Sequence, residues 1–131
     1  MLTTILAAIL AQAAPAQFSP ARTLPPPDEN DLVDLPIEQQ TALRCAVAIA
    51  LAAERQRQGQ AEGQDWPDLL AQQRGREFFV RTFARLIDDT GLTREDLALR
   101  GRREAEDLTA DESRLDAVMP ACTLLFEASG L

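Results

Sequence analysis

Cysteine and arginine are the residue types in this chain with the clearest chemistry, and the sequence contains no histidine, tyrosine or lysine. The two cysteines, Cys45 and Cys122, allow one pairing, which is expected if the chain reaches an oxidising compartment. The alternative is two unpaired thiols packed as small hydrophobic side chains. Without histidine there is no Ser-His or Cys-His pair, and two thiolates alone do not complete a zinc site. We therefore expect no metal and no cofactor.

Catalysis would have to rely on carboxylates and arginine, as in glycoside hydrolysis by two acids. Asp88 and Asp89 are the nearest such pair, and they are adjacent in the sequence. Neighbouring residues of a helix diverge by about 100°, so these two acids cannot easily face one substrate. We expect no enzymatic activity.

An arginine row on one predicted helical face is the strongest candidate for a binding surface. Arg74, Arg81 and Arg85 fall within about 40° of one another, and Phe78 projects beside them. A row of planar cations next to an aromatic ring can receive a carboxylate, a phosphate or the acidic face of a partner. The alternative is a solvated face with ion pairs such as Glu77 to Arg81, in which the N-terminal segment or another helix covers Phe78.

Length and composition describe a soluble globular protein with a single domain. The chain has 131 residues, of which 46% are hydrophobic and 26% charged. Its 13 basic residues, all arginine, face 21 acids and give a formal net charge of −8. Such a field repels phosphate backbones, so we expect no nucleic acid partner.

Residues 1–16 have the pattern of a secretory signal peptide. They carry no charged side chain, and their apolar run is shorter than the roughly 20 residues that span a bilayer. Ala14-Pro15-Ala16 supplies a small-residue cleavage site before Gln17, with Ala11-Gln12-Ala13 as a second option. The alternative is a ragged N-terminal helix. We expect cleavage near Ala16, a periplasmic or secreted product, and no stable membrane span in the mature chain.

Residues 17–34 are expected to form a proline-rich, acidic tether to a single helical domain at 35–131. Six prolines lie between residues 15 and 36, which excludes a helix and favours extended polyproline II structure. The first helix of the domain is apolar nearly all round from 42 to 53, so we expect it to be central and to hold Cys45 in the core. Asp34 is its expected N-terminal cap, and Gly59 and Gly63 mark its exit.

Two further helices are expected in the middle of the chain. One runs from Asp65 to Asp89, with Gly75 as a weak point and Gly91 as the residue that ends it. The other begins at Thr93, which forms a capping box with Asp96, and ends near Gly101. The apolar stripe expected on the first of these two helices comprises Leu69, Phe79, Phe83, Leu86 and Ile87.

The last helix is expected to be kinked at Pro120, which interrupts a continuous apolar face and removes the hydrogen bond to Asp116. Because Cys122 lies on this face and Cys45 lies on the central helix, we predict a disulfide that clamps the two helices together. No strand-like alternation is present, so the expected fold is an all-α bundle of about four helices. The apolar face comprises Leu115, Val118, Met119, Cys122, Leu125 and Phe126.

The stretches TALRCAVAIALAAERQ, GREFFVRTFARLIDDTGLTREDL and VMPACTLLFEASGL resemble small, exported, two-cysteine helical proteins of Gram-negative bacteria, a group with no assigned function. A looser similarity is to periplasmic acid-stress chaperones, which are also small, helical and clamped by one disulfide. The function expected is that of a non-catalytic interaction or structural module with an unidentified protein partner. The alternatives are a carrier of a small apolar ligand and a protein similar to the acid-stress chaperones.

Overall fold

The computed structural model describes residues 34–131, and the part of the chain that it describes is helical without any strand. The signal peptide predicted for residues 1–16 and nearly all of the tether predicted for 17–34 lie outside these residues. The helices are α1 (Ile37–Arg57), α2 (Arg74–Thr90), α3 (Arg94–Thr109) and α4 (Glu112–Ala128), and the short 3-10 helix η2 (Ala71–Gln73) precedes α2.

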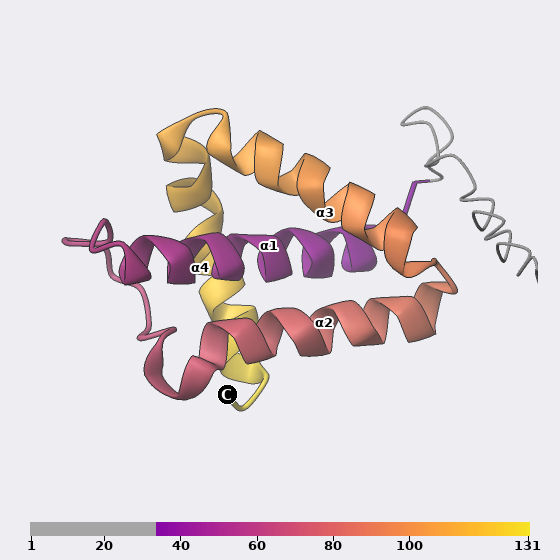
Figure 1. The fold of residues 1–131 in the computed structure, drawn as a ribbon, viewed down its shortest axis with the longest axis horizontal. Helices are drawn as coiled ribbons and strands as arrows, with labels where there is room; N and C mark the ends of the chain where they lie inside the picture. The colour runs from indigo at the N-terminus through magenta and orange to yellow at the C-terminus, as the bar shows by residue number, and fades with distance from the viewer. Residues whose placement is uncertain (1–33) are drawn as a thin grey trace, which may run out of the picture.

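Helix α1 is the central element, as its apolar sequence predicts. It packs against each of the other three helices, and Ala46, Ala48, Ile49 and Ala52 have no exposed surface. Figure 1 shows α2 and α3 on either side of α1, whereas α4 crosses behind and connects the two sides. The small alanine side chains along α1 leave room for the three other helices to pack close to it.

The cap expected at Asp34 is wrong, because α1 begins three residues later. Pro36 is the capping residue and has an extended backbone, and its carbonyl accepts hydrogen bonds from the amides of Gln39 and Gln40 at 2.9 Å. Proline fixes the backbone angle at the start of the helix, and no side-chain hydrogen bond caps this end. The exit is close to the prediction, since α1 ends at Arg57 and Gly59 follows with a φ of 71°.

Helix α2 begins at Arg74, so the start predicted at Asp65 is also wrong. The carboxamide of Gln56 on α1 donates to the carbonyl of Pro67 at 2.8 Å and accepts from the amide of Leu69 at 2.9 Å. These bonds hold the chain against the end of α1 in a non-helical path. Gln72 and Gln73 then adopt positive φ values of 54° and 56°, so no continuous α-helix runs from Asp65 into α2.

Gly75 is a contact point between helices and not the weak point that the sequence suggests. A Cβ atom at this position would lie 3.0 Å from the Cβ of Ala53 and 3.2 Å from that of Leu69. Leu69 is buried, but it lies before the helix and not on the stripe that includes Phe79. The predicted end of α2 is confirmed, because Gly91 takes the left-handed conformation with a φ of 70°.

Helix α3 begins as predicted and continues past its predicted end. Thr93 is the capping residue, and its hydroxyl accepts a hydrogen bond from the amide of Asp96 at 3.1 Å. Gly101 lies inside the helix, where an added Cβ would be 3.1 Å from the ring of Phe83. This glycine allows α3 to lie close to α2 and does not end the helix.

Replacing Thr93 by alanine is expected to reduce the free energy of unfolding by about 1 kcal/mol, because the amide of Asp96 loses its acceptor. In a domain of this size, that loss lowers the melting temperature by about 4–8 °C. Thermal unfolding followed by circular dichroism measures it. Thr41→Ala is the matched control, since Thr41 is exposed near the start of α1 and its hydroxyl donates to the carbonyl of Ile37 without capping an amide. Equal shifts for both variants would contradict the capping role.

Helix α4 buries the face that the sequence predicts, with one exception. Leu115, Met119 and Phe126 have no exposed surface, whereas Leu125 is 42% exposed and is not a core residue. The helix continues from Glu112 to Ala128 with the exposed Pro120 inside it. The predicted apolar face is therefore kept across the proline.

The predicted disulfide is confirmed. Cys45 of α1 and Cys122 of α4 are bonded, with Cα atoms 4.9 Å apart and a separation of 77 positions in the sequence. Both are 2% exposed. The bond fastens the last helix to the central one in the middle of the core.

The cap of α4 provides a prediction of acid sensitivity. The pKa of Asp111 is lowered because the backbone N–H of Ser113 and then its hydroxyl donate to the carboxylate. Such a group contributes stability above its unfolded pKa of about 3.9, and the contribution is lost as the pH falls through the lower folded value. We expect the urea midpoint of the native protein to fall more steeply below about pH 4 than that of Asp111→Asn.

The measurement is a series of urea titrations at stepwise lower pH. Glu112→Gln controls for the change in net charge, because Glu112 is the neighbouring exposed acid. Parallel pH profiles for the native protein and Asp111→Asn would show that this cap does not contribute to the acid response.

Candidate functional site

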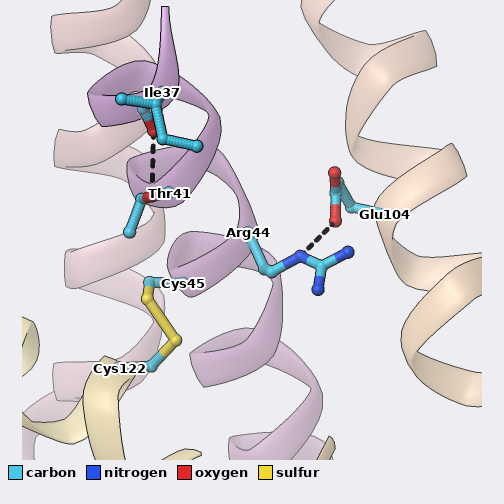
Figure 2. The surroundings of a disulfide bond; sticks show 6 residues. All are labelled: Ile37, Thr41, Arg44, Cys45, Glu104 and Cys122. Atoms are coloured by element: carbon cyan, nitrogen blue, oxygen red, sulfur yellow. Dashed lines mark hydrogen bonds and ion pairs between the residues drawn. A yellow bond between two sulfur atoms is a disulfide. The ribbon is translucent and has the colours of Figure 1, made fainter. Parts of the chain in front are cut away.

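Arg44 lies at the centre of a network of ion pairs that connects three helices. It is the one charged residue between 42 and 53, and Cys45 is its neighbour in the sequence. Figure 2 shows Arg44 pointing toward Glu104 on α3, while Cys45 points toward Cys122 on α4. Successive residues of a helix diverge by about 100°, so α1 can direct Cys45 into the core and Arg44 toward the surface.

The guanidinium of Arg44 binds two carboxylates of α3. Its Nε lies 3.1 Å from Glu104 and its terminal nitrogen lies 3.0 Å from Asp107. Asp107 also accepts from Arg114, the residue that brings α4 into this network. The network therefore joins α1, α3 and α4 at the surface, beside the disulfide that joins α1 and α4 in the core.

A first cleft of about 300 Å³ lies on one side of Arg44 and is open to solvent. Its walls are the beginning of α1 and the second half of α3, and the chain enters the fold along it at Asp34 and Leu35. The lining residues are Asp34, Leu35, Gln40, Leu43, Arg44, Arg100, Arg103, Glu104 and Asp107.

A second cleft of about 310 Å³ lies between the same network and α4. Arg44 and Asp107 form a wall that the two clefts share. The side chains of this cleft are partly apolar, because Leu108, Ala117 and Val118 contribute to it along with Arg114.

The chemistry that these clefts support is charge recognition. Arg44 and its partners are between one quarter and one half exposed, with side-chain accessibilities of 42% for Arg44 and 25% for Glu104. Ion pairs with this exposure contribute at most about 1 kcal/mol each, so solvent and ligands can compete for them. Arginines in a cleft of this kind favour a carboxylate or phosphate group.

The structure divides the predicted patch, because Phe78 is buried, Arg74 is half-buried, and Arg81 and Arg85 are exposed. Phe78 is only 7% exposed and packs edge to face on Phe126, with ring centroids 5.6 Å apart. The expectation that Phe78 stands beside the arginines as an accessible aromatic is therefore wrong. Helix α4 crosses this side of α2, and its Phe126 covers the ring of Phe78. This is one of the alternatives expected from the sequence, in which another helix covers Phe78.

Arg74 is occupied by contacts within the fold. Its guanidinium lies 5.0 Å from the centroid of Phe126 and donates to the carbonyl of Leu131 at 2.8 Å. Arg81 and Arg85 are exposed on the surface of α2, and Arg81 donates to Glu77 at 2.7 Å. The i,i+4 pair from Glu77 to Arg81 is confirmed, and a partner or anion site on the row stays a prediction that now rests on Arg81 and Arg85.

Sequence reasoning missed the clefts around Arg44. Arg44 is separated from Glu104 by 60 residues and from Asp107 by 63, so no local spacing connects them. The available signal is the single arginine in an otherwise apolar segment, since a half-buried charge requires an opposite charge or hydrogen-bond acceptors nearby.

Comparison with models of known families, with curated proteins and with solved structures finds no match for this chain. Two further findings concern residues 34–131. None of the helices there has the length and apolar character needed to cross a membrane. The cysteine, aspartate and glutamate side chains of this region form no group of three or more that could hold a metal ion.

Proposed function

We propose that this chain is an exported, non-catalytic interaction or structural module whose helical domain is clamped by the Cys45–Cys122 bridge. The bridge carries the proposal, because it closes a long loop and lies in the core. Disulfides of this kind form and persist in oxidising compartments such as the periplasm. The apolar pattern of residues 1–16, with a cleavage site near Ala16, supports the same compartment.

Several features of the residues support an interaction role over catalysis. The sequence has no histidine, lysine or tyrosine for general acid or base work. Asp88 and Asp89 are exposed neighbours on α2, and Glu104 and Asp107 are engaged by arginine. Charged residues line much of both clefts, which favours a polar partner over the apolar ligand of a carrier.

Two finer points of the architecture belong to this proposal. We expect α4 to bend at Pro120, because proline has no N–H to donate to the carbonyl of Asp116. We also expect the helices to behave as one small bundle around α1, so that the domain unfolds in a single cooperative transition.

The native mass of the protein tests export and the bridge together. The chain is expressed with its own N-terminus and recovered from the periplasm. We expect the mass of residues 17–131 less about two hydrogens, one from each thiol in the bridge. A discrete adduct would favour the carrier, and an uncleaved chain with free thiols would overturn export and the clamp.

Leu6→Arg is the matched variant for export, because a charge inside the apolar run weakens recognition as a signal peptide. We expect this variant to stay uncleaved and to be absent from the periplasm. Cleavage at an unchanged level would show that residues 1–16 do not act as the signal.

The interaction role is tested with the oxidised protein as bait in a periplasmic extract. If the exposed arginines of α2 form the contact, Arg81→Glu with Arg85→Glu removes the partner, whereas Arg76→Glu retains it. Arg76 is an exposed arginine at the start of the same helix and controls for the charge change. Repeated empty captures would count against an interaction module, and equal loss in all variants would count against this surface.

A further inference from the structure

We propose that the second cleft, between the Arg44 network and α4, is a binding site for a short aliphatic carboxylate. The carboxylate group binds the guanidinium of Arg114, and the aliphatic chain lies on the apolar side chains of the cleft. None of the lining residues belongs to α2, so this site is separate from the exposed arginines of α2 that the interaction role invokes. A failed partner capture therefore leaves this site untouched, and the reverse holds as well.

The volume of the second cleft limits the size of its ligand. It holds about 310 Å³ and is open to solvent. Binding sites for small molecules span roughly 300–1,000 Å³, so this cleft is at the lower end of the range. A short chain with one polar group fits such a space.

Three uncharged side chains form the apolar part of the cleft. Leu108 comes from α3, and Ala117 and Val118 come from α4. Leu108 is fully buried, Val118 is half-buried and Ala117 is exposed, so a ligand meets mainly the two side chains of α4. An aliphatic chain on this surface removes apolar area from water, whereas a wholly polar anion does not. The cleft therefore favours an anion with an apolar tail.

Arg114 supplies the charged contact. Its side chain is 50% exposed, and its Nη1 donates both to the carbonyl of Asp107 at 3.3 Å and to the carboxylate of the same residue. A guanidinium carries five N–H donors on three nitrogens, so contacts through one nitrogen leave room for a second acceptor. An exposed ion pair is also weak. Arg114 can therefore bind a ligand carboxylate without losing Asp107.

The charges of the lining favour an anion at Arg114. Two arginines and a single acid line the cleft, and that acid, Asp107, accepts from both Arg44 and Arg114. Arg44 also binds Glu104, which is not part of the lining. Since Arg44 has two carboxylates and Arg114 shares one of them, a further carboxylate binds most favourably at Arg114, beside the apolar side chains of α4.

A titration with hexanoate tests the proposal on the oxidised protein labelled with nitrogen-15. We expect saturable shifts at concentrations of about the millimolar range, as is usual for so small a ligand. The amides of residues 86–91 should not shift, because Figure 1 places the end of α2 far from the start of α4. Unchanged amides around the cleft would overturn the proposal. The amides expected to shift are those of Asp107, Leu108, Arg114, Ala117 and Val118.

Acetate and hexan-1-ol separate the two contacts of the ligand. Acetate has the carboxylate without the chain, and hexan-1-ol has the chain without the carboxylate. We expect each to bind at least about tenfold more weakly than hexanoate, because each loses one contact. If acetate binds as well as hexanoate, the apolar side chains have no part in binding. If hexan-1-ol does, Arg114 has none. Either result would overturn the proposal.

Ala117→Asp and Ala121→Asp form the matched pair of variants. Both residues are exposed alanines on α4, one turn apart, and the cleft lining includes Ala117 but not Ala121. An acid at position 117 repels the ligand carboxylate and competes for Arg114. We expect hexanoate to bind at least about tenfold more weakly to Ala117→Asp and with unchanged affinity to Ala121→Asp. Equal affinities of the two variants would overturn the site.

Arg114→Gln keeps the test valid if an acid at position 117 prevents folding. Arg102→Gln is its control, because Arg102 is an exposed arginine on α3 outside the lining and the change in charge is the same. We expect about tenfold weaker binding of hexanoate to Arg114→Gln alone, with the weak binding of hexan-1-ol unchanged in both variants. An unchanged affinity of Arg114→Gln for hexanoate would overturn the proposal.

The C-terminus of a protein chain is another source of an aliphatic carboxylate, and a short peptide ending in leucine tests it. We expect this peptide to bind no more tightly than hexanoate. Asp107 is the one carboxylate among the lining residues that could accept from peptide amides, and it already accepts from two arginines. Binding of the peptide that is tenfold tighter or more would overturn a free acid as the ligand.

Discussion

Opening the Cys45–Cys122 bridge is expected to lower the free energy of unfolding by as much as about 4.5 kcal/mol. The bond joins two residues that are 77 positions apart in the sequence. It closes a long loop and therefore removes much of the conformational freedom of the unfolded chain. Domains are stable by only about 5–15 kcal/mol, so the reduced protein should be close to unfolding at room temperature.

Urea unfolding of the oxidised and reduced protein measures this loss. The variant Cys45→Ala with Cys122→Ala separates the bond from the reducing conditions, because reductant should not change its midpoint. A native protein whose oxidised and reduced midpoints coincide would show that packing alone holds α4 in place.

Replacing Phe126 by alanine is expected to reduce the free energy of unfolding by about 3–5 kcal/mol. The ring has no exposed surface and lies at the crossing of α4 over α2. It contacts Phe78 edge to face and Arg74 through its face, at 5.6 Å and 5.0 Å between group centres. Truncation leaves a cavity and removes both contacts.

Leu124→Ala is the control for this prediction, because Leu124 lies on the same helix and is 68% exposed. Removing most of the Leu124 side chain should change the free energy of unfolding by no more than about 0.5 kcal/mol. Chemical unfolding with the oxidised form of each variant provides the comparison. Similar losses for the two substitutions would mean that the covered side of α4 has been assigned incorrectly.

Local sequence signals predicted those elements whose causes lie within a few residues. Gly91 ends α2 because the left-handed conformation suits glycine, and Thr93 caps α3 through its own hydroxyl. The apolar spacing of α4 correctly placed Cys122 in the core. These signals depend on neighbours along the chain, which the sequence displays directly.

The failed predictions share a different physical cause. The start of α2 depends on Gln56, whose carboxamide holds Pro67 and Leu69 from the end of another helix. The spacing of Phe79 and Phe83 predicted one buried side of α2, but the crossing of α4 also buries Phe78. Periodicity within a helix reports its apolar positions and cannot report how many neighbours cover them.

The clefts around Arg44 lay beyond sequence reasoning for the same reason. Their walls come from helices α1 and α3, and from α4 for the second cleft. The geometry of such a surface depends on how helices cross, and crossing angles follow from the packing of side chains between them.

Composition and short-range periodicity are enough to predict the helical class of the domain, its central apolar helix and the pairing of Cys45 with Cys122, because these features have local causes. The packing of Arg74 and Phe78 against Phe126, and the ion pairs of Arg44 with Glu104 and Asp107, depend instead on how the helices are arranged. These contacts connect residues far apart in the chain. Their formation depends on the way the helices pack, and no local pattern of residue types encodes it.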